Sequence, residues 1–226
     1  LAAITAFIAL ALALFIAYGR RLFPSRLAQV SSRVLGLGYA LPGTVVAIGV
    51  LVPFTFLDNK VSAFMVSRFD YNTGLLLSGT VFILVFAYLV RFLPIALNTV
   101  DAGLAKVRPS MDEAGRSMGL SPLQMMRRVH VPIMRGSLAT ALLLVFVDVL
   151  KELPATLLLR PFNFNTLAIR TFELANEERL ADAAGPALAI VLASLIPVIL
   201  LSRSLRQPSN TPSKKASQGA SSAKAD

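Results

Sequence analysis

Five apolar segments, each close to the length of a membrane-spanning helix, dominate this chain. They cover about residues 1–19, 37–57, 74–97, 136–153 and 183–202. A helix needs about 20 consecutive apolar residues to cross the hydrocarbon core of a bilayer. In lipid every backbone polar group must be satisfied internally, so an isolated apolar segment adopts a helix there. We therefore expect an all-α, multi-spanning membrane protein with about five transmembrane helices.

The composition agrees with a membrane protein and excludes several other classes. The chain is 55% hydrophobic and 15% charged, whereas soluble domains have about 45–50% apolar and about 25% charged residues. The net charge of +10 would suit a nucleic-acid partner, but the positions of the basic residues suit a membrane protein better. The absence of cysteine excludes disulfides, thiolate chemistry and cysteine-based metal sites. We expect contact with membrane lipid and no nucleic acid.

The basic residues are divided unequally between the two sides of the expected bundle. Fifteen of the 22 Lys and Arg residues lie in the loop after the first segment, the loop after the third and the C-terminal tail, and six lie in the other connections. The side with the excess is normally cytoplasmic. We expect the loop of about residues 100–135 and the tail in the cytoplasm and the N-terminus outside, in a multi-pass inner-membrane protein.

The two ends of the chain lead to separate expectations. The chain begins with Leu1 and is apolar at once, with Arg20 and Arg21 after the apolar segment, whereas a signal peptide has its basic residues first. We expect residues 1–18 to span the membrane and the preceding part to be missing, because the chain is either a piece of a longer protein or a trimmed one. Residues 207–226 are too polar to bury a core and should form a disordered basic tail, which leaves a transmembrane domain at 1–206.

The polar insert between the third and fourth segments has the signals of two short helices. Acids at Asp112 and Glu113 favour a helix start, and Gly119 can end that helix in the left-handed conformation. Ser121 followed by a proline is a typical start for a second helix, which can run to about His130. The first helix has a small, apolar side, which suits close packing against a partner; it is formed by Ala114, Gly115 and Met118.

The insert, EAGRSMGLSPLQMMRRVHVP at residues 113–132, also resembles the EAA loop of binding-protein-dependent ABC transporter permeases. That pattern is E-A-A, three residues, G, nine residues, then I-x-L-P. The matching positions here are Glu113, Ala114, Gly119 and Pro132, with Gly115 in place of the second Ala and Val129 and Val131 in place of Ile and Leu. The resemblance implies the helical permease fold of type I ABC importers, also called MetI-like. We refer to residues 113–132 as the EAA-like loop.

The resemblance implies partners as well as a fold. In this family the short helix docks in a cleft of an ATP-binding subunit. The corresponding segment here runs from Glu113 to Leu120, and the resemblance implies two copies of the ATP-binding subunit in the importer. A periplasmic substrate-binding protein and a second permease half, from a missing N-terminal region or another copy, would complete the importer. The chain has no GxxxxGK[ST] phosphate loop, so we expect hydrolysis in a partner, no cofactor and no enzyme activity here. The alternative is an ordinary basic loop with two amphipathic helices.

Ionisable residues near the outer end of the fourth segment form a second candidate site. Lys151 and Glu152 follow Asp148 by three and four residues, which places all three on one helix face. Pro154 then breaks the helix. Ionisable groups at membrane depth usually face the bundle interior or a water-filled cavity. They would line a translocation path or outer gate, or else form an ion pair of Lys151 with an acid at the membrane surface.

A narrower resemblance points to a cargo. The segments YALPGT from Tyr39, KELPATLLLRPFNFNTLA from Lys151 and AAGPALAIVLASLIPVIL from Ala183 resemble permeases of ferric iron importers, which implies iron(III) as cargo. Acids that could ligate iron lie in an outer loop, but we expect them to form a solvated helix face that meets the binding protein; they are Glu173, Glu177, Glu178 and Asp182. We expect no metal site in the chain.

Two further points remain open in the sequence. Arg91 is the one charge deep in the third segment, and it should extend to the cytoplasmic interface, with an ion pair to Asp148 as the alternative. The function has two alternatives to iron(III) import. One is the same architecture for another cargo, such as thiamine, sulfate, molybdate or a polyamine. The other is a membrane scaffold or channel without ATPase partners.

Overall fold

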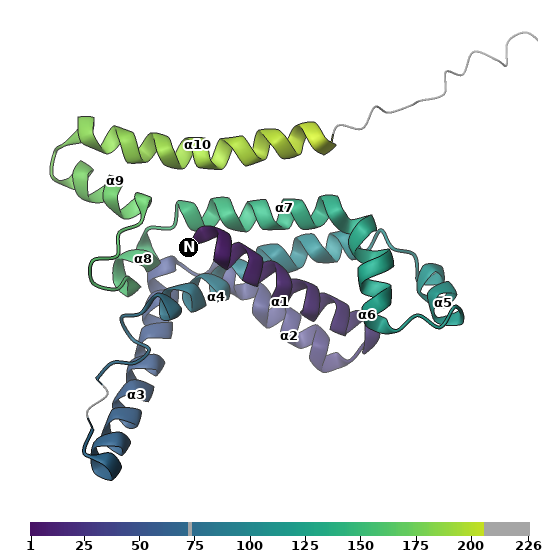
Figure 1. Cartoon of the computed structure of the whole chain (residues 1–226), viewed down its shortest axis with the longest axis horizontal. Coiled ribbons are helices and arrows are strands. Elements are labelled where there is room, and N and C mark those ends of the chain that lie inside the picture. Colours follow the sequence, from purple (N-terminus) through teal and green to yellow (C-terminus); the bar gives the residue numbers. More distant parts are fainter. Residues whose placement is uncertain (72–73, 206–226) are drawn as a thin grey trace, which may run out of the picture.

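The computed structural model describes residues 1–71 and 74–205, and all regular structure in these ranges is helical (Figure 1). The elements in order are α1 (Ala2–Leu22), α2 (Arg26–Gly36), the 3-10 turn η1 (Leu37–Ala40), α3 (Gly43–Phe69), α4 (Val81–Leu104), α5 (Pro109–Ser117), α6 (Pro122–Met125), the π-turn η2 (Met126–His130), α7 (Val131–Leu150), α8 (Pro154–Leu159), α9 (Leu167–Asn176) and α10 (Leu180–Leu205). The expected tail at 207–226 lies outside the described residues.

Among the described residues, five helices are long and apolar enough to cross a membrane, which agrees with the expected number and confirms the all-α fold. They are Ala2–Leu22, Gly43–Phe69, Val81–Leu104, Pro122–Leu150 and Leu180–Ile199. The largest differences from the expected bounds are at the end of α3, which continues to Phe69, and at the start of the fourth span, which begins at Pro122. Helix α4 also begins later than expected, because residues 74–80 form a turn. Two glycines with positive φ shape this turn, and the carboxylate of Asp58 on α3 accepts hydrogen bonds from the backbone N–H groups of Leu77 and Ser78.

The core is formed where α1, α4 and α7 pack together. Apart from Thr5, the buried face of α1 consists of alanines at a spacing of three or four residues, which lets neighbouring helices approach closely; they are Ala2, Ala6, Ala9, Ala13 and Ala17. Larger side chains of α4 and α7 fill the space opposite, including Ile83, Leu84, Leu138 and Val145. This three-helix core fixes the positions of the connections at both of its ends.

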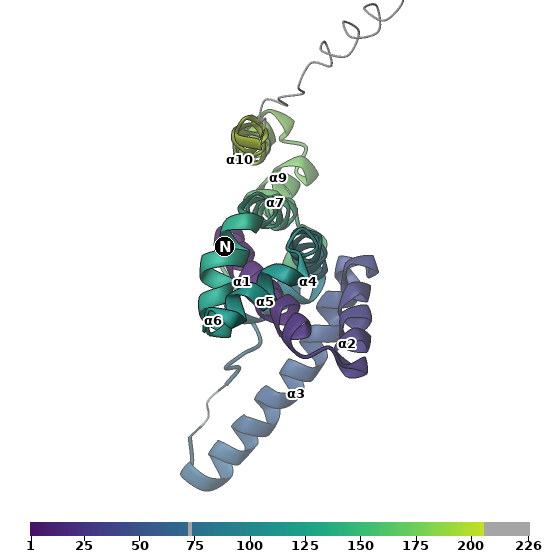
Figure 2. The ribbon, with the colours of Figure 1, turned by 90° about the vertical axis from the view of Figure 1, so that its right-hand side faces the viewer.

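Two spanning helices lie at the edge of this core. In Figures 1 and 2, α3 leaves the bundle, while α10 runs alongside α7 on the opposite side. Most large apolar side chains of both helices are exposed, such as Ile48, Phe56 and Phe64 on α3 and Leu188, Leu192 and Ile196 on α10. Such surfaces require lipid or another polypeptide to cover them.

Candidate functional site

The two helices of the EAA-like loop form as the sequence predicts. Helix α5 begins at Pro109, three residues earlier than expected, and its acid in the first turn is Asp112. Gly119 ends the segment at φ 74°, in the left-handed region. Ser121 and Gln124 form a capping box at the start of α6, since each side chain bonds the other residue's backbone N–H. Local capping therefore fixes the shape of this loop.

Gly115 joins the two helices of the loop. It is buried, and a Cβ at this position would come 1.7 Å from Cε of Met125. The small residue thus serves packing inside the loop, and not the contact with a partner that the sequence suggests. Glu113, Ala114 and Met118 remain exposed, and the backbone N–H of Leu120 donates to the carbonyl of Gly115. The exposed surface of the loop is therefore narrower than expected.

A π-turn within the EAA-like loop leads into α7. The backbone N–H of Val131 donates to the carbonyl of Met126, five residues earlier. Pro132 has no N–H and its ring would clash with the carbonyl four residues before it, so a wider turn is favoured here. We expected the chain to turn back at Pro132, and the structure instead places Pro132 in the first turn of α7, just after η2. Figure 1 shows the α6 segment lying across the direction of α7.

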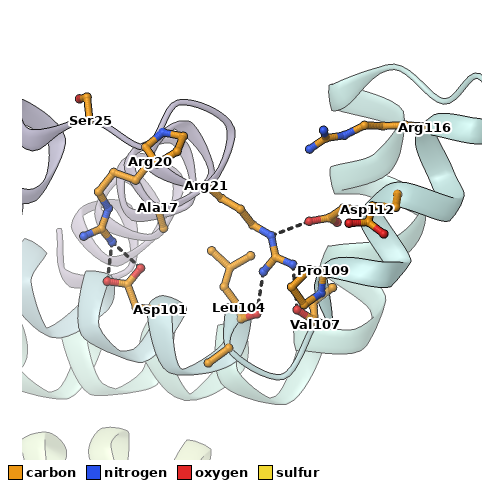
Figure 3. Close-up of a pocket in the computed structure, with 13 residues that line it drawn as sticks. Ala17, Arg20, Arg21, Ser25, Asp101, Leu104, Val107, Pro109, Asp112 and Arg116 are labelled. Atoms are coloured by element: carbon orange, nitrogen blue, oxygen red, sulfur yellow. Dashed lines mark hydrogen bonds and ion pairs between the residues drawn. The ribbon is translucent and has the colours of Figure 1, made fainter.

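Asp112, which immediately precedes the EAA-like loop in α5, connects this region to α1. Its Oδ1 lies 2.7 Å from Nε2 of His130 and its Oδ2 lies 2.8 Å from Nε of Arg21, which also donates to the carbonyls of Leu104 and Val107 (Figure 3). Partial burial raises the pKa of Asp112, but the hydrogen bonds from His130 and Arg21 outweigh it and leave the pKa below its ordinary value of 3.8.

Two more contacts of α1 reach the same region. The hydroxyl of Tyr18 donates to the carbonyl of Pro122 at 2.7 Å, and its ring meets His130 edge-on. Arg20 forms an ion pair with Asp101 of α4. These charged groups border an open cavity of about 750 Å³, together with Glu113 and Arg116 (Figure 3). In the sequence, Arg20 and Arg21 bear on the orientation and on the absence of a signal-peptide pattern, and no local pattern identifies their partners.

The second candidate site is split by the structure. Asp148 pairs with Lys151 at 2.8 Å, but α7 ends at Leu150, so Glu152 is no longer in helical register with them. Glu152 is only 6% exposed, and its Oε1 lies 2.8 Å from Nη1 of Arg91. The single face predicted for Asp148, Lys151 and Glu152 is therefore wrong.

The same ion pair corrects the expectation for Arg91. The side chain of Arg91 pairs with Glu152, not Asp148, beyond the end of α7 that is remote from the EAA-like loop. Pro154 begins helix α8 just after this junction. The pairing lies between segments that are about 60 residues apart, which explains why sequence patterns did not reveal it.

Arginines neutralise three of the four acids that the sequence placed in the outer loop. Glu173 pairs with Arg160 at 2.9 Å, and Arg179 lies within 4 Å of both Glu177 and Asp182. This agrees with a charged helix face. Within the described ranges no three His, Asp or Glu residues are grouped as metal ligands would be.

Comparison with known proteins identifies the family. Residues 9–207 match the family described as "Binding-protein-dependent transport system inner membrane component". A relative from Haemophilus influenzae, "Fe(3+)-transport system permease protein FbpB 2", is 36% identical over 124 residues, which are 55% of this chain and 24% of that protein. "Putative 2-aminoethylphosphonate transport system permease protein PhnV" from Salmonella typhimurium is 28% identical over 170 residues, 75% of this chain and 57% of that protein. The chain thus spans from about a quarter to just over half of these relatives' lengths.

Solved structures agree on the fold. A bacterial alginate ABC transporter, in complex with an alginate pentasaccharide-bound periplasmic protein, has a chain that superposes with a TM-score of 0.66 at 15% identity, covering 88% of this chain and 70% of that one. The inward-facing methionine ABC transporter MetNI gives a TM-score of 0.65 at 13% identity, covering 91% and 88%. By the match over most of its length, this chain belongs to the binding-protein-dependent transport system inner membrane components, the permeases of ABC importers.

Proposed function

We propose that this chain is the permease part of an importer that carries iron(III) from a periplasmic binding protein to the cytoplasm, driven by ATP hydrolysis in a partner subunit. The observation that supports this most is the EAA-like loop, a compact helical unit that is attached to the core and presents exposed Glu113, Ala114 and Met118. The transmembrane domain is 1–206 and the tail is 207–226.

The orientation follows from charge. The end of the bundle that carries the loop also carries the excess of basic residues, so it faces the cytoplasm, and the N-terminus lies outside. Two ATP-binding subunits dock there, one of them on the segment 113–120 of this chain. When ATP binds, the two ATPase subunits close on each other and pull the docked segment 113–120 with them.

The loop transmits that pull because it is attached at two places. The π-turn continues directly into α7, and the bonds of Asp112 with His130 and Arg21 connect α5 to η2 and α1. A unit held in this way moves with both helices, and the pathway changes from inward-facing to outward-facing. The path or gate candidates are Asp148, Lys151, Glu152 and Pro154.

A second permease half completes the pathway. The exposed apolar faces of α3 and α10 need a cover, and five spans are too few to enclose a path. The chain's share of its relatives' length, 24% and 57%, supports a half contributed by the rest of a longer polypeptide or by another copy.

The iron cargo rests on the ferric-type segments and the ferric relative. The phosphonate relative supports a second candidate, since it matches more of this chain at lower identity. The test is uptake by proteoliposomes that contain the full-length gene product, its ATPase and its binding protein. ATP-dependent uptake of ⁵⁵Fe(III) supports iron as the cargo, and uptake of 2-aminoethylphosphonate alone supports the phosphonate alternative. If the protein takes up neither compound and does not bind the ATPase, a scaffold or channel is supported instead.

A further inference from the structure

A charged pair lies inside the bundle, away from the EAA-like loop. Arg91 is the eleventh of 24 residues in α4, and its Nη1 lies 2.8 Å from Oε1 of Glu152, with side chains 20% and 6% exposed. Charges at membrane depth are costly and mark functional sites more often than structural ones. Replacement of a buried ion pair by apolar groups is often neutral or stabilising, so stability alone is a weak reason for this pair.

Gly43 brings a third segment onto the pair. A Cβ at this position would lie 2.0 Å from Nη1 of Arg91 and 2.6 Å from Oε1 of Glu152. No other residue fits there unless the pair moves. Gly38 is equally close to α4, since its Cβ would come 2.2 Å from the carbonyl oxygen of Val90. Gly38 lies in η1, so both η1 and the start of α3 pack directly on the middle of α4.

Glu152 also fixes the short helix α8. Its Oε1 accepts the backbone N–H of Ala155 at 3.1 Å, and its carbonyl accepts the hydroxyl of Thr156 at 2.7 Å. The same hydroxyl forms a hydrogen bond with Tyr88, one turn before Arg91 on α4. Two residues of α4 thus hold the junction between α7 and α8. We call Gly43, Arg91 and Glu152 the Arg91 cluster.

The position of the cluster relative to the loop suggests its role. Helix α7 starts at the π-turn of the loop and ends two residues before Glu152. Twenty residues of α-helix extend about 30 Å, so the loop and Glu152 lie at opposite ends of one rigid element. Any movement that the loop imparts to α7 reaches α3 and α4 at the Arg91 cluster.

We propose that the Arg91 cluster is a conformational contact of the transport cycle, formed in the conformation described here and separated when α7 moves. Arg91 and Glu152 are then positioning residues, which set where α3, α4 and α8 meet. This inference rests on the proposed function, because it takes α7 to be driven by the loop. Coupling of this kind requires an element with two arrangements that both sites bias.

The test separates folding from coupling in the complete importer, with its ATPase and binding protein in proteoliposomes. Glu152→Gln leaves Arg91 buried and unpaired, which destabilises the fold. Arg91→Gln/Glu152→Gln removes both charges, so its thermal midpoint recovers toward wild type. If the cluster is a conformational contact, the double variant still transports at least fivefold less cargo per ATP and hydrolyses ATP faster without binding protein. The matched control is Asn98→Ala, since Asn98 is exposed and lies two turns along α4 from Arg91. This control should transport as much cargo per ATP as wild type.

Gly43→Ala provides an independent variant, since it displaces the pair without changing its charges. It should show the same loss of cargo per ATP. Wild-type coupling in both the double variant and Gly43→Ala would overturn the inference and leave the pair a packing feature. If the binding protein does not stimulate ATP hydrolysis by the wild-type importer, the proposed function is overturned instead. The two failures are therefore distinguishable.

Discussion

His130 and Asp112, eighteen residues apart, lie with Nε2 and Oδ1 2.7 Å from each other. This bond closes the EAA-like loop at its base, because Asp112 is in α5 and His130 is the last residue of the π-turn. His130 is 2% exposed, so the contact is shielded from water. The loop is thereby a closed unit that is bound to α1 through Arg21.

Asp112→Asn should loosen this closure. The carboxylate accepts bonds from two side chains, and hydrogen bonds to charged groups contribute about 1.5–3 kcal/mol each. We expect the amides of α5 to exchange hydrogen at least tenfold faster, as measured by mass spectrometry. Ser110→Ala, exposed in the same helix, should leave the exchange unchanged. Equal exchange in Asp112→Asn and wild type would refute a structural role for Asp112.

Acid should act on the same bond. The pKa of Asp112 in the folded protein lies below its ordinary value of 3.8, so the carboxylate contributes stability that is complete above pH 3.8 and is lost as the pH falls through the lower, folded value. Protection of the α5 amides should therefore hold from pH 7 to about pH 5 and fall below pH 4, after correction for intrinsic exchange. Asp112→Asn should lack this acid-dependent step, and a step that persists in the variant would assign it to another group.

Gly115 and Met125 should be energetically coupled. A Cβ on Gly115 would lie 1.7 Å from Cε of Met125, so Gly115→Ala forces the methionine to move, at a cost of about 1–3 kcal/mol. Met125→Ala removes the obstacle. The double variant should therefore lose less stability than the sum of the single losses, which thermal unfolding measures as a double-mutant cycle. Strict additivity would contradict the contact.

The turn between α5 and α6 should tolerate asparagine but not valine at position 119. Gly119 has φ 74°, and a Cβ at this position would have no neighbouring atom within 4 Å, so the constraint is in the backbone and not in space. A β-branched residue in the left-handed region is strained by about 1–3 kcal/mol, whereas Asn adopts it readily. Gly119→Val should reduce ATPase stimulation severalfold and Gly119→Asn should not. Equal activity of the two would show that the turn geometry is unimportant.

The sequence predicted those features that depend on neighbours along the chain. Hydropathy predicts the five spans because each one meets lipid as a separate segment, and the turn at Gly119 and the cap at Ser121 follow from backbone preferences. The sequence does not predict a helix boundary that is set by a residue far away along the chain. The start of α4 was expected near residue 74, but the carboxylate of Asp58 holds residues 77 and 78 outside the helix.

Contacts between helices could not be predicted in the same way. The partner of Arg91 depends on how α4 packs against the junction of α7 and α8, and no local pattern contains that information. Helical periodicity placed Glu152 on the face of Asp148, and this failed because the helix ended one turn early. Likewise, the bonds of Tyr18 to Pro122 and of Arg21 to Asp112 join residues 104 and 91 positions apart.

The most direct test of the account is binding of the ATPase subunit that is encoded beside this gene to the full-length gene product, reconstituted in membranes. Wild type is compared with Glu113→Ala/Gly119→Val, and with Asn59→Ala on α3, remote from the loop, as control. The account predicts that wild type and Asn59→Ala bind the subunit and stimulate its ATPase, and that the double variant loses both. Undiminished binding and stimulation by the double variant would contradict the assignment of residues 113–132 as the coupling loop.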